Sequence, residues 1–174
     1  GFPGGPALEQ AAGQGDEARF TFPRPLRGRP GCDFSFAGLK SAMARTLDAM
    51  KGPPSETDIA DLAASFQAAI TDVLTERTAH GIKAFQARHG KSAGTLVVAG
   101  GVAANQAVRA RLARLSQSSG LQFIAPPASL CTDNAAMVAW AGIERLSRGL
   151  CDGLEVAARP RWPLDPTARQ RLSA

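Results

Sequence analysis

The sequence lacks the features of a membrane-spanning or secreted protein. No apolar run is long enough to cross a bilayer, and no segment near the start resembles the apolar core of a signal peptide. The chain starts with glycine and has no initiator methionine, so we expect a soluble piece of a longer protein. Its three cysteines are odd in number, widely spaced and without a CxxC pair, which favours a reduced, cytoplasmic protein over a disulfide framework.

Familiar catalytic patterns are also missing. There is no Walker A motif for nucleotide phosphates, and no Ser–His–Asp or Cys–His arrangement has credible spacing. The 174 residues, 44% of them hydrophobic, suffice for one α/β domain or for half of a two-lobed protein. Length, composition and these absences therefore indicate an α/β domain or half-domain and no particular reaction.

Acidic residues are scarce where basic ones gather. None occurs between Glu76 and Asp133, and most of the 20 basic residues are arginines, whose planar guanidinium suits phosphate oxygens. Such a surface is either a solvated, arginine-rich exterior or an electrostatic footprint for nucleic acid. The candidate phosphate contacts are Arg24, Arg27, Arg29, Arg109, Arg111 and Arg114.

One stretch organises the chain. Residues 95–99 form an apolar, β-branched run typical of a buried strand, and Gly100 and Gly101 end it ahead of a predicted helix. Without Cβ atoms, the two glycines allow positive φ and let a planar ligand lie against the backbone. The helix start beyond them suits an anionic group. A turn without a ligand is the alternative, and Asn105 is either the helix cap or a side chain that contacts a ligand.

Periodicity and turn residues predict the remaining elements. A capping box at Ser55 and Asp58 opens the longest helical pattern, which resumes after Gly81 and closes at Gly90. The other predictions are a turn over 1–6, a short helix over 7–12, a loop over 13–31, a strand over 33–36, a helix over 38–50, a helix over 104–116, a strand over 121–125, a loop over 128–131 and a helix over 134–148 that is buried at its beginning.

A second strand-to-helix turn, at 131–134, follows the second strand. In a parallel sheet both turns lie at the carboxyl ends of the strands, so they can face one cleft. Asp133 lies in this turn as the first acid after the long basic region. It is either a helix N-cap or one ligand of a divalent cation, although one carboxylate is too few for a site.

Six motifs in order give a specific resemblance. They are FPGGP at 2–6, FPRP at 22–25, DFSFAGLK at 33–40, AGGVAAN at 99–105, CTDNAAM at 131–137 and PRWP at 160–163. Together they resemble the bacterial tRNA N6-adenosine threonylcarbamoyltransferases, the TsaD (Gcp) family. The resemblance implies the C-terminal part of the actin-like, Hsp70-like and sugar-kinase-like (ASKHA) α/β fold. It also implies a helical portion at about 38–90, a nucleotide-binding portion at about 91–165 and an absent N-terminal lobe.

The same resemblance implies an activity and its site. Family members transfer the threonylcarbamoyl group from threonylcarbamoyl-adenylate to N6 of the adenosine beside the anticodon, in tRNAs that read codons starting with A. The family's ligand-contacting positions fall on Gly5 and Asn105, and its metal-binding Asp falls on Asp133. From their lack of side chains we also predict that Gly100 and Gly101 form the floor on which the adenosine lies. The metal is one divalent ion, Fe(II) or Zn(II), whose two histidine co-ligands belong to the missing half. We therefore expect the chain to be inactive by itself.

The implied partners are tRNA, an inactive paralogue (TsaB-like) and a P-loop ATPase subunit (TsaE-like), all in the cytoplasm. An ATPase or sugar kinase of the same fold would share the glycine turn but not the motifs at 33–40 and 132–136. A non-catalytic partner subunit would lack Asn105 and Asp133, and both are present.

Overall fold

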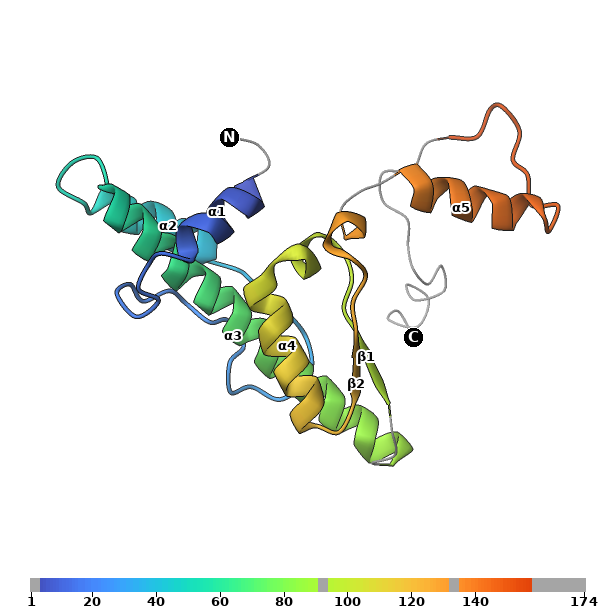
Figure 1. Cartoon of the computed structure of the whole chain (residues 1–174), viewed down its shortest axis with the longest axis horizontal. Helices are drawn as coiled ribbons and strands as arrows, with labels where there is room; N and C mark the ends of the chain where they lie inside the picture. Colours follow the sequence, from blue (N-terminus) through green and yellow to red (C-terminus); the bar gives the residue numbers. More distant parts are fainter. Residues whose placement is uncertain (1–3, 91–93, 132–134, 158–174) are drawn as a thin grey trace, which may run out of the picture. The chain divides into compact units, whose positions relative to one another are not determined.

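The computed structural model describes residues 4–90, 94–131 and 135–157 (Figure 1). The chain divides into two compact units, Gly1–Asp133 and Asn134–Ala174. The described residues are mostly helical, with one small parallel sheet. In order the elements are α1 (Gly4–Ala12), α2 (Leu39–Asp48), α3 (Glu56–His89), β1 (Thr95–Val97), the 3₁₀ turn η1 (Gly101–Ala104), α4 (Gln106–Ser118), β2 (Gln122–Ile124), the 3₁₀ turn η2 (Ala128–Leu130) and α5 (Ala135–Leu146).

Helix α3 is the spine of the first unit. The predicted capping box is confirmed: the Ser55 hydroxyl accepts from the Asp58 backbone N–H at 3.1 Å, and the Asp58 carboxylate accepts from the Ser55 N–H at 2.9 Å. The helix then runs through Gly81 without a break for 34 residues. A helical glycine costs about 1 kcal/mol, and burial of Ile82 just beyond it offsets that cost.

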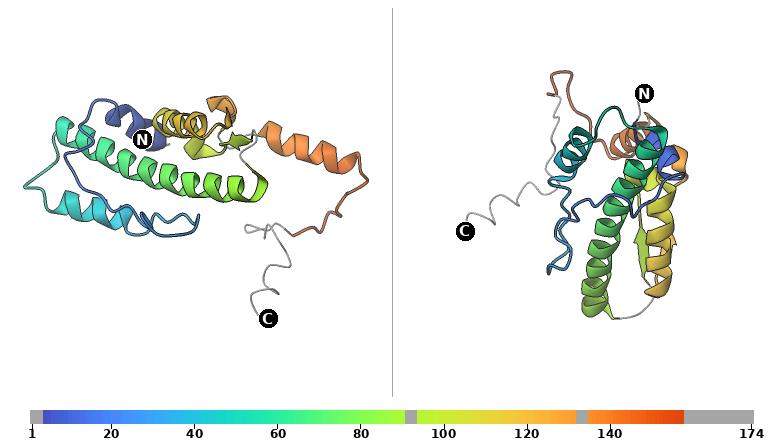
Figure 2. Two further views of the ribbon diagram at one scale, coloured as in Figure 1. Left: turned by 90° about the horizontal axis from the view of Figure 1, so that it is seen from below. Right: turned by 90° about the vertical axis from the view of Figure 1, so that its left-hand side faces the viewer.

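The predicted loop over 13–31 is confirmed as irregular chain, and it packs along α3. Phe22 is buried, and its ring meets that of Phe66 edge-on at 5.6 Å. Gly15 lies so close to the spine that a Cβ there would overlap the Ala60 carbonyl group, which requires glycine. Helices α1 and α2 pack on different sides of α3 (Figure 2). The core is therefore built on α3.

The sheet confirms the predicted parallel pairing, with Leu96 opposite Phe123. Helix α4 follows the glycine turn and packs against both α3 and β2. The prediction that the first strand is buried is wrong: burial alternates along β1, and Val97 is 63% exposed. The reason is that the described residues place helix α4 against this sheet and supply two strands, so one face stays open.

Two further predictions near the start need correction. Residues 33–36 alternate like a strand but form irregular chain, with Phe34 51% exposed, because neither of the two described strands pairs with them. Residues 4–6, predicted as a turn, are the first turn of α1, where Pro6 costs nothing because its missing N–H would have no helical partner. The short loop predicted at 128–131 contains the 3₁₀ turn η2.

The second unit contains α5, for which we predicted burial at its beginning. That prediction is wrong for the described unit: α5 has no buried residue, and Trp140 is 69% exposed. The helix is apolar on most sides, and the described part of its unit, residues 135–157, supplies too little chain to cover it. No helix among the described residues is both long and apolar enough to cross a lipid bilayer.

Candidate functional site

The sequence predicts that both glycines of the turn can take positive φ, and the structure shows positive φ at one of them. Gly100 has φ 88° and ψ 176°, a conformation that only glycine adopts readily. Gly101 opens η1 with ordinary φ, and a Cβ there would meet no atom within 4 Å. Gly100 is thus needed for the shape of the turn, whereas Gly101 leaves space beside it.

That space belongs to a cavity of about 380 Å³, which we call the glycine cavity. Three predicted adenylate-contacting residues, Gly5, Gly101 and Asn105, line it together, although Gly5 lies far from the others in sequence. Helix α1 brings Gly5 to this place because its Leu8, Ala11 and Ala12 pack on α3. The remaining lining residues are Gly4, Pro6, Leu8, Glu9, Gln67, Ile70, Val102, Ala104 and Val108.

Asn105 is held by two hydrogen bonds at the rim of α4. Its Oδ1 accepts from the Val108 N–H at 2.9 Å, so it caps the helix, and its Nδ2 donates to Gln67 Oε1 at 2.7 Å. An amide carries two N–H groups and two acceptor lone pairs, so one of each remains for a ligand. The cap and the predicted ligand contact are therefore compatible, and the cap fixes the orientation of the amide.

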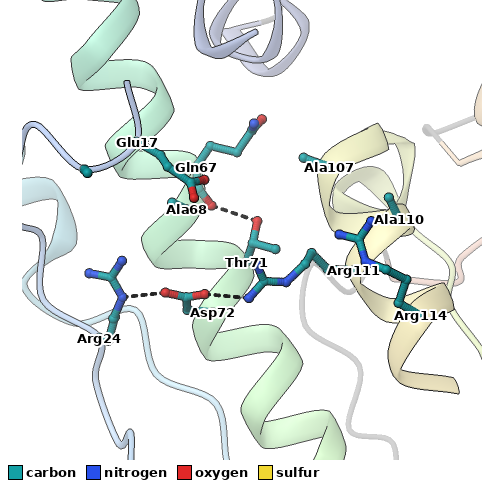
Figure 3. Close-up of a pocket in the computed structure, with 11 residues that line it drawn as sticks. Glu17, Arg24, Gln67, Ala68, Thr71, Asp72, Ala107, Ala110, Arg111 and Arg114 are labelled. Carbon is teal, nitrogen blue, oxygen red and sulfur yellow. Dashed lines mark hydrogen bonds and ion pairs between the residues drawn. The ribbon is translucent and has the colours of Figure 1, made fainter. Parts of the chain in front are cut away.

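A second cavity, of about 500 Å³, lies between the 17–24 segment, α3 and α4 (Figure 3). We call it the basic groove. Asp72 lies between two arginines in it: Arg24 Nε is 2.7 Å from Oδ2, and Arg111 Nη2 is 2.9 Å from Oδ1. Arg27 approaches the same carboxylate at 3.9 Å. The groove is lined by Glu17, Ala18, Arg24, Gln67, Ala68, Thr71, Asp72, Ala107, Ala110, Arg111 and Arg114.

The six arginines predicted to contact phosphate thus lie in different surroundings. Arg24, Arg27 and Arg111 converge on Asp72, Arg114 lines the same groove, and the Arg29 side chain is exposed on the neighbouring loop.

Arg109 points into the protein. Its guanidinium donates to the carbonyls of Ala103 and Pro126 and contacts Cys131 Sγ at 3.1 Å. It thereby ties the glycine turn to the chain that follows β2. The predicted phosphate role of Arg109 stays a prediction, which this bonding disfavours.

One wall of the basic groove is fixed by ion pairs. The guanidinium of Arg19 and the N–H of Asp16 hold the pKa of Asp61 below its ordinary value. The Ser55 hydroxyl and N–H, together with Arg19, likewise lower the pKa of Asp58. Arg19 bridges both carboxylates and so pins the loop start to the first turns of α3.

The predicted metal ligand Asp133 lies outside the described residues. Among the residues described, no three His, Cys, Asp or Glu side chains are grouped closely enough to hold a metal ion. Nearby Cys131 is buried, and its thiol contacts Arg109 and the Pro126 carbonyl. The described part of the chain therefore offers no ligand set of its own for a metal.

Sequence reasoning missed three residues of these cavities. Gln67 lines both, Asp72 gathers the arginines, and the Glu9 carboxylate accepts from the Gln106 N–H at 2.7 Å, linking α1 to α4. Gln67 and Asp72 lie among apolar positions of one long helix, where polar residues usually indicate only a solvated face. No local signal distinguishes them.

Comparison with known proteins agrees with the motifs. The family profile described as "TsaD: tRNA N6-adenosine threonylcarbamoyltransferase" matches residues 1–140. The chain is 54% identical over 174 residues to the tRNA N6-adenosine threonylcarbamoyltransferase of Paramagnetospirillum magneticum, covering all of this chain and 50% of that protein. It is 55% identical to those of Rhodospirillum rubrum and Sinorhizobium medicae, covering 48% of each. The chain thus spans about half the length of the curated relatives it matches.

Proposed function

The chain belongs to the TsaD family of tRNA N6-adenosine threonylcarbamoyltransferases, and we propose on that premise that it is the C-terminal part of such an enzyme. The full-length protein would have the ASKHA fold and transfer the threonylcarbamoyl group from threonylcarbamoyl-adenylate to N6 of the adenosine beside the anticodon. The 174-residue chain would be inactive alone. Family membership favours this activity over an ATPase or sugar kinase of the same fold.

One observation carries the proposal: Gly5, Gly101 and Asn105, all predicted from the sequence to contact the adenylate, line one cavity. In this role the two glycines give the adenosine a floor without side chains, and Gly100 sets the turn that presents it. Asn105, oriented by its cap and by Gln67, offers its free amide N–H and lone pair to the ligand. The cavity would hold the donor while the RNA amine attacks the carbamoyl carbon and the adenylate phosphate leaves.

The test is a transfer assay with the full-length protein, threonylcarbamoyl-adenylate and unmodified tRNA. Modified adenosine should appear in tRNAs that read codons starting with A, and Asn105→Ala should weaken donor binding without changing tRNA binding. Catalysis of ATP-dependent sugar phosphorylation in place of acyl transfer would contradict the proposal.

Asp133 would be the carboxylate ligand of one divalent metal, Fe(II) or Zn(II), with two histidines from the other half of the protein. The metal would polarise the acyl donor and orient it. An N-cap role predicts that Asp133→Asn is nearly silent, because asparagine caps as well as aspartate. A ligand role predicts a loss of about 100-fold or more in transfer, with reduced metal content and unchanged melting temperature.

Metal content of full-length Asp133→Asn, measured by elemental analysis beside its transfer rate, decides between these roles. Normal transfer by this variant would exclude the metal role. Tight, stoichiometric metal on the 174-residue chain alone would exclude the shared ligand set.

We further propose that the enzyme acts in the cytoplasm with tRNA, an inactive paralogue and a P-loop ATPase subunit. Phosphates of the tRNA would contact a subset of the six arginines, and the structure favours those of the basic groove over Arg109. Affinity should then fall steeply with salt, because each phosphate contact releases a counterion.

A further inference from the structure

The charges of the basic groove do not neutralise one another. Four guanidiniums lie in it or at its edge, those of Arg24, Arg27, Arg111 and Arg114. Among the residues that the structure describes, the lining carboxylates are those of Glu17 and Asp72. A cluster that served internal ion pairing alone would not need this excess, and a net positive groove attracts anions.

Two of the guanidiniums are already oriented. Arg24 uses Nε on Asp72 and donates through Nη1 to the Phe22 carbonyl at 3.1 Å, and Arg111 uses Nη2 on Asp72. A guanidinium has five N–H donors, so each of these side chains keeps several for a ligand. Because Asp72 has restricted them beforehand, less side-chain entropy is lost on binding.

Arg114 adds a further guanidinium to the groove lining. Among the described residues it has no hydrogen-bond or ion-pair partner, and its side chain lies on α4 beside the groove (Figure 3). The walls between the charged groups are formed by small side chains, which leave room for a bulky backbone. They are Ala18, Ala68, Ala107 and Ala110.

We propose that the basic groove binds backbone phosphates of the RNA substrate through Arg24, Arg111 and Arg114, with Asp72 as the residue that positions the first two. This inference rests on the proposed function, which supplies the RNA. The groove is separate from the glycine cavity but shares Gln67 with it. Phosphate bound here therefore lies next to the proposed donor site, as an acceptor strand requires.

The experiment measures binding of a fluorescent tRNA transcript to the full-length protein over a series of salt concentrations. The double variant Arg111→Gln/Arg114→Gln should weaken binding at least about 10-fold at moderate salt. It should also lower the log–log salt slope by about 1 to 2, since two contacts are removed. The matched control is Lys83→Gln/Arg88→Gln, which removes the same charge from exposed positions on α3 outside the groove and should keep the wild-type slope.

Asp72 distinguishes an organised site from diffuse charge. Asp72→Asn removes a negative charge, which would strengthen purely electrostatic binding, but it also releases Arg24 and Arg111. We expect weaker binding, while Asp48→Asn, at an exposed position outside the groove, should leave binding unchanged or slightly tighter. Tighter binding by Asp72→Asn would overturn its positioning role.

A phosphate group could also come from the donor or from free inorganic phosphate. If either were the ligand, the double variant would lose donor affinity or phosphate competition and keep the wild-type RNA slope, which overturns the inference. Equal losses of RNA affinity and of salt slope in the Lys83→Gln/Arg88→Gln control would overturn the inference as well. Failure of the wild-type protein to bind or modify any tRNA would instead refute the proposed function, so the two failures are distinguishable.

Discussion

The glycine cavity and the basic groove are built by the same two helices, α3 and α4, yet they differ in chemistry. The glycine cavity gains its space from residues without side chains and is bounded by α1, which packs through Leu8, Ala11 and Ala12. The groove gains its character from arginines, and its loop wall is pinned by Arg19 on Asp58 and Asp61. A largely apolar surface with open space suits a planar ligand, and a basic one suits a polyanion, so one helix pair can serve donor and acceptor separately.

The largest expected effect concerns the glycine cavity. Gly101→Val should weaken binding of threonylcarbamoyl-adenylate to the full-length protein roughly 100-fold or more, because the new side chain fills the cavity. The fold should persist, since a Cβ there meets no atom within 4 Å.

Calorimetric titration with the donor measures the loss of binding in Gly101→Val, and a thermal melt measures whether its fold persists. Gly81→Val is the matched control, because Gly81 also has open space but lies outside the cavity. Unchanged donor affinity in Gly101→Val would remove the glycine cavity from the mechanism.

A second prediction distinguishes the structural role of Arg109 from the phosphate-binding role proposed for Arg114 on the same helix, α4. Arg109→Met removes the guanidinium that donates to the carbonyls of Ala103 and Pro126 and should lower the free energy of unfolding by about 1–3 kcal/mol. Its effect on the RNA salt slope should be absent.

Arg114→Met is the counterpart of Arg109→Met, with stability within about 0.5 kcal/mol of wild type. Its salt slope should be lower by about 1. Chemical denaturation and salt-dependent RNA binding measure the two quantities. A reduced slope in Arg109→Met at unchanged stability would reinstate its phosphate role.

Gln67 lines both the glycine cavity and the basic groove, and its substitution should have a moderate effect. Gln67→Met removes the acceptor of the Asn105 amide and should weaken donor binding about 2- to 12-fold while leaving RNA affinity nearly unchanged. Gln86→Met is the control on the same helix, since Gln86 bonds to Ser119 away from both cavities. Equal losses in donor and RNA affinity would show that the two regions act as one.

The smallest effect concerns pH. The folded-state pKa of Asp58 and of Asp61 is lowered, so their stabilising contribution is complete above the unfolded value of about 3.9 and is lost as pH falls through the folded pKa values. Below about pH 4 the groove wall at 16–24 should lose hydrogen-exchange protection before helix α1 does.

In the Arg19→Gln variant, residues 16–24 should lose less hydrogen-exchange protection on acidification. Without the Arg19 guanidinium the pKa values of Asp58 and Asp61 are lowered less, so less of the stability of this segment depends on their ionisation. Simultaneous loss in both segments would mean that ion pairs do not distinguish the two regions.

Sequence by itself determined the local elements and the family. The capping box of α3, the strand, glycine turn and helix at 95–118, and the parallel pairing all follow from periodicity, caps and glycine. The cap, the strand, the glycine turn and the helix depend on neighbours within a few residues, and the parallel pairing follows from the order strand, helix, strand. Predictions of burial at β1 and α5 were wrong because burial depends on which other surfaces are present to cover an apolar face.

Only the tertiary structure decided which side chains meet. Gly5 joins Gly101 and Asn105 because α1 packs on α3, and no local pattern indicates that contact. Arginines 109, 111 and 114 look alike in sequence, yet one is tied to backbone carbonyls, one to Asp72 and one lines the groove without a partner among the described residues. Their roles differ because the helix rotates about 100° per residue and points neighbouring side chains at different surroundings.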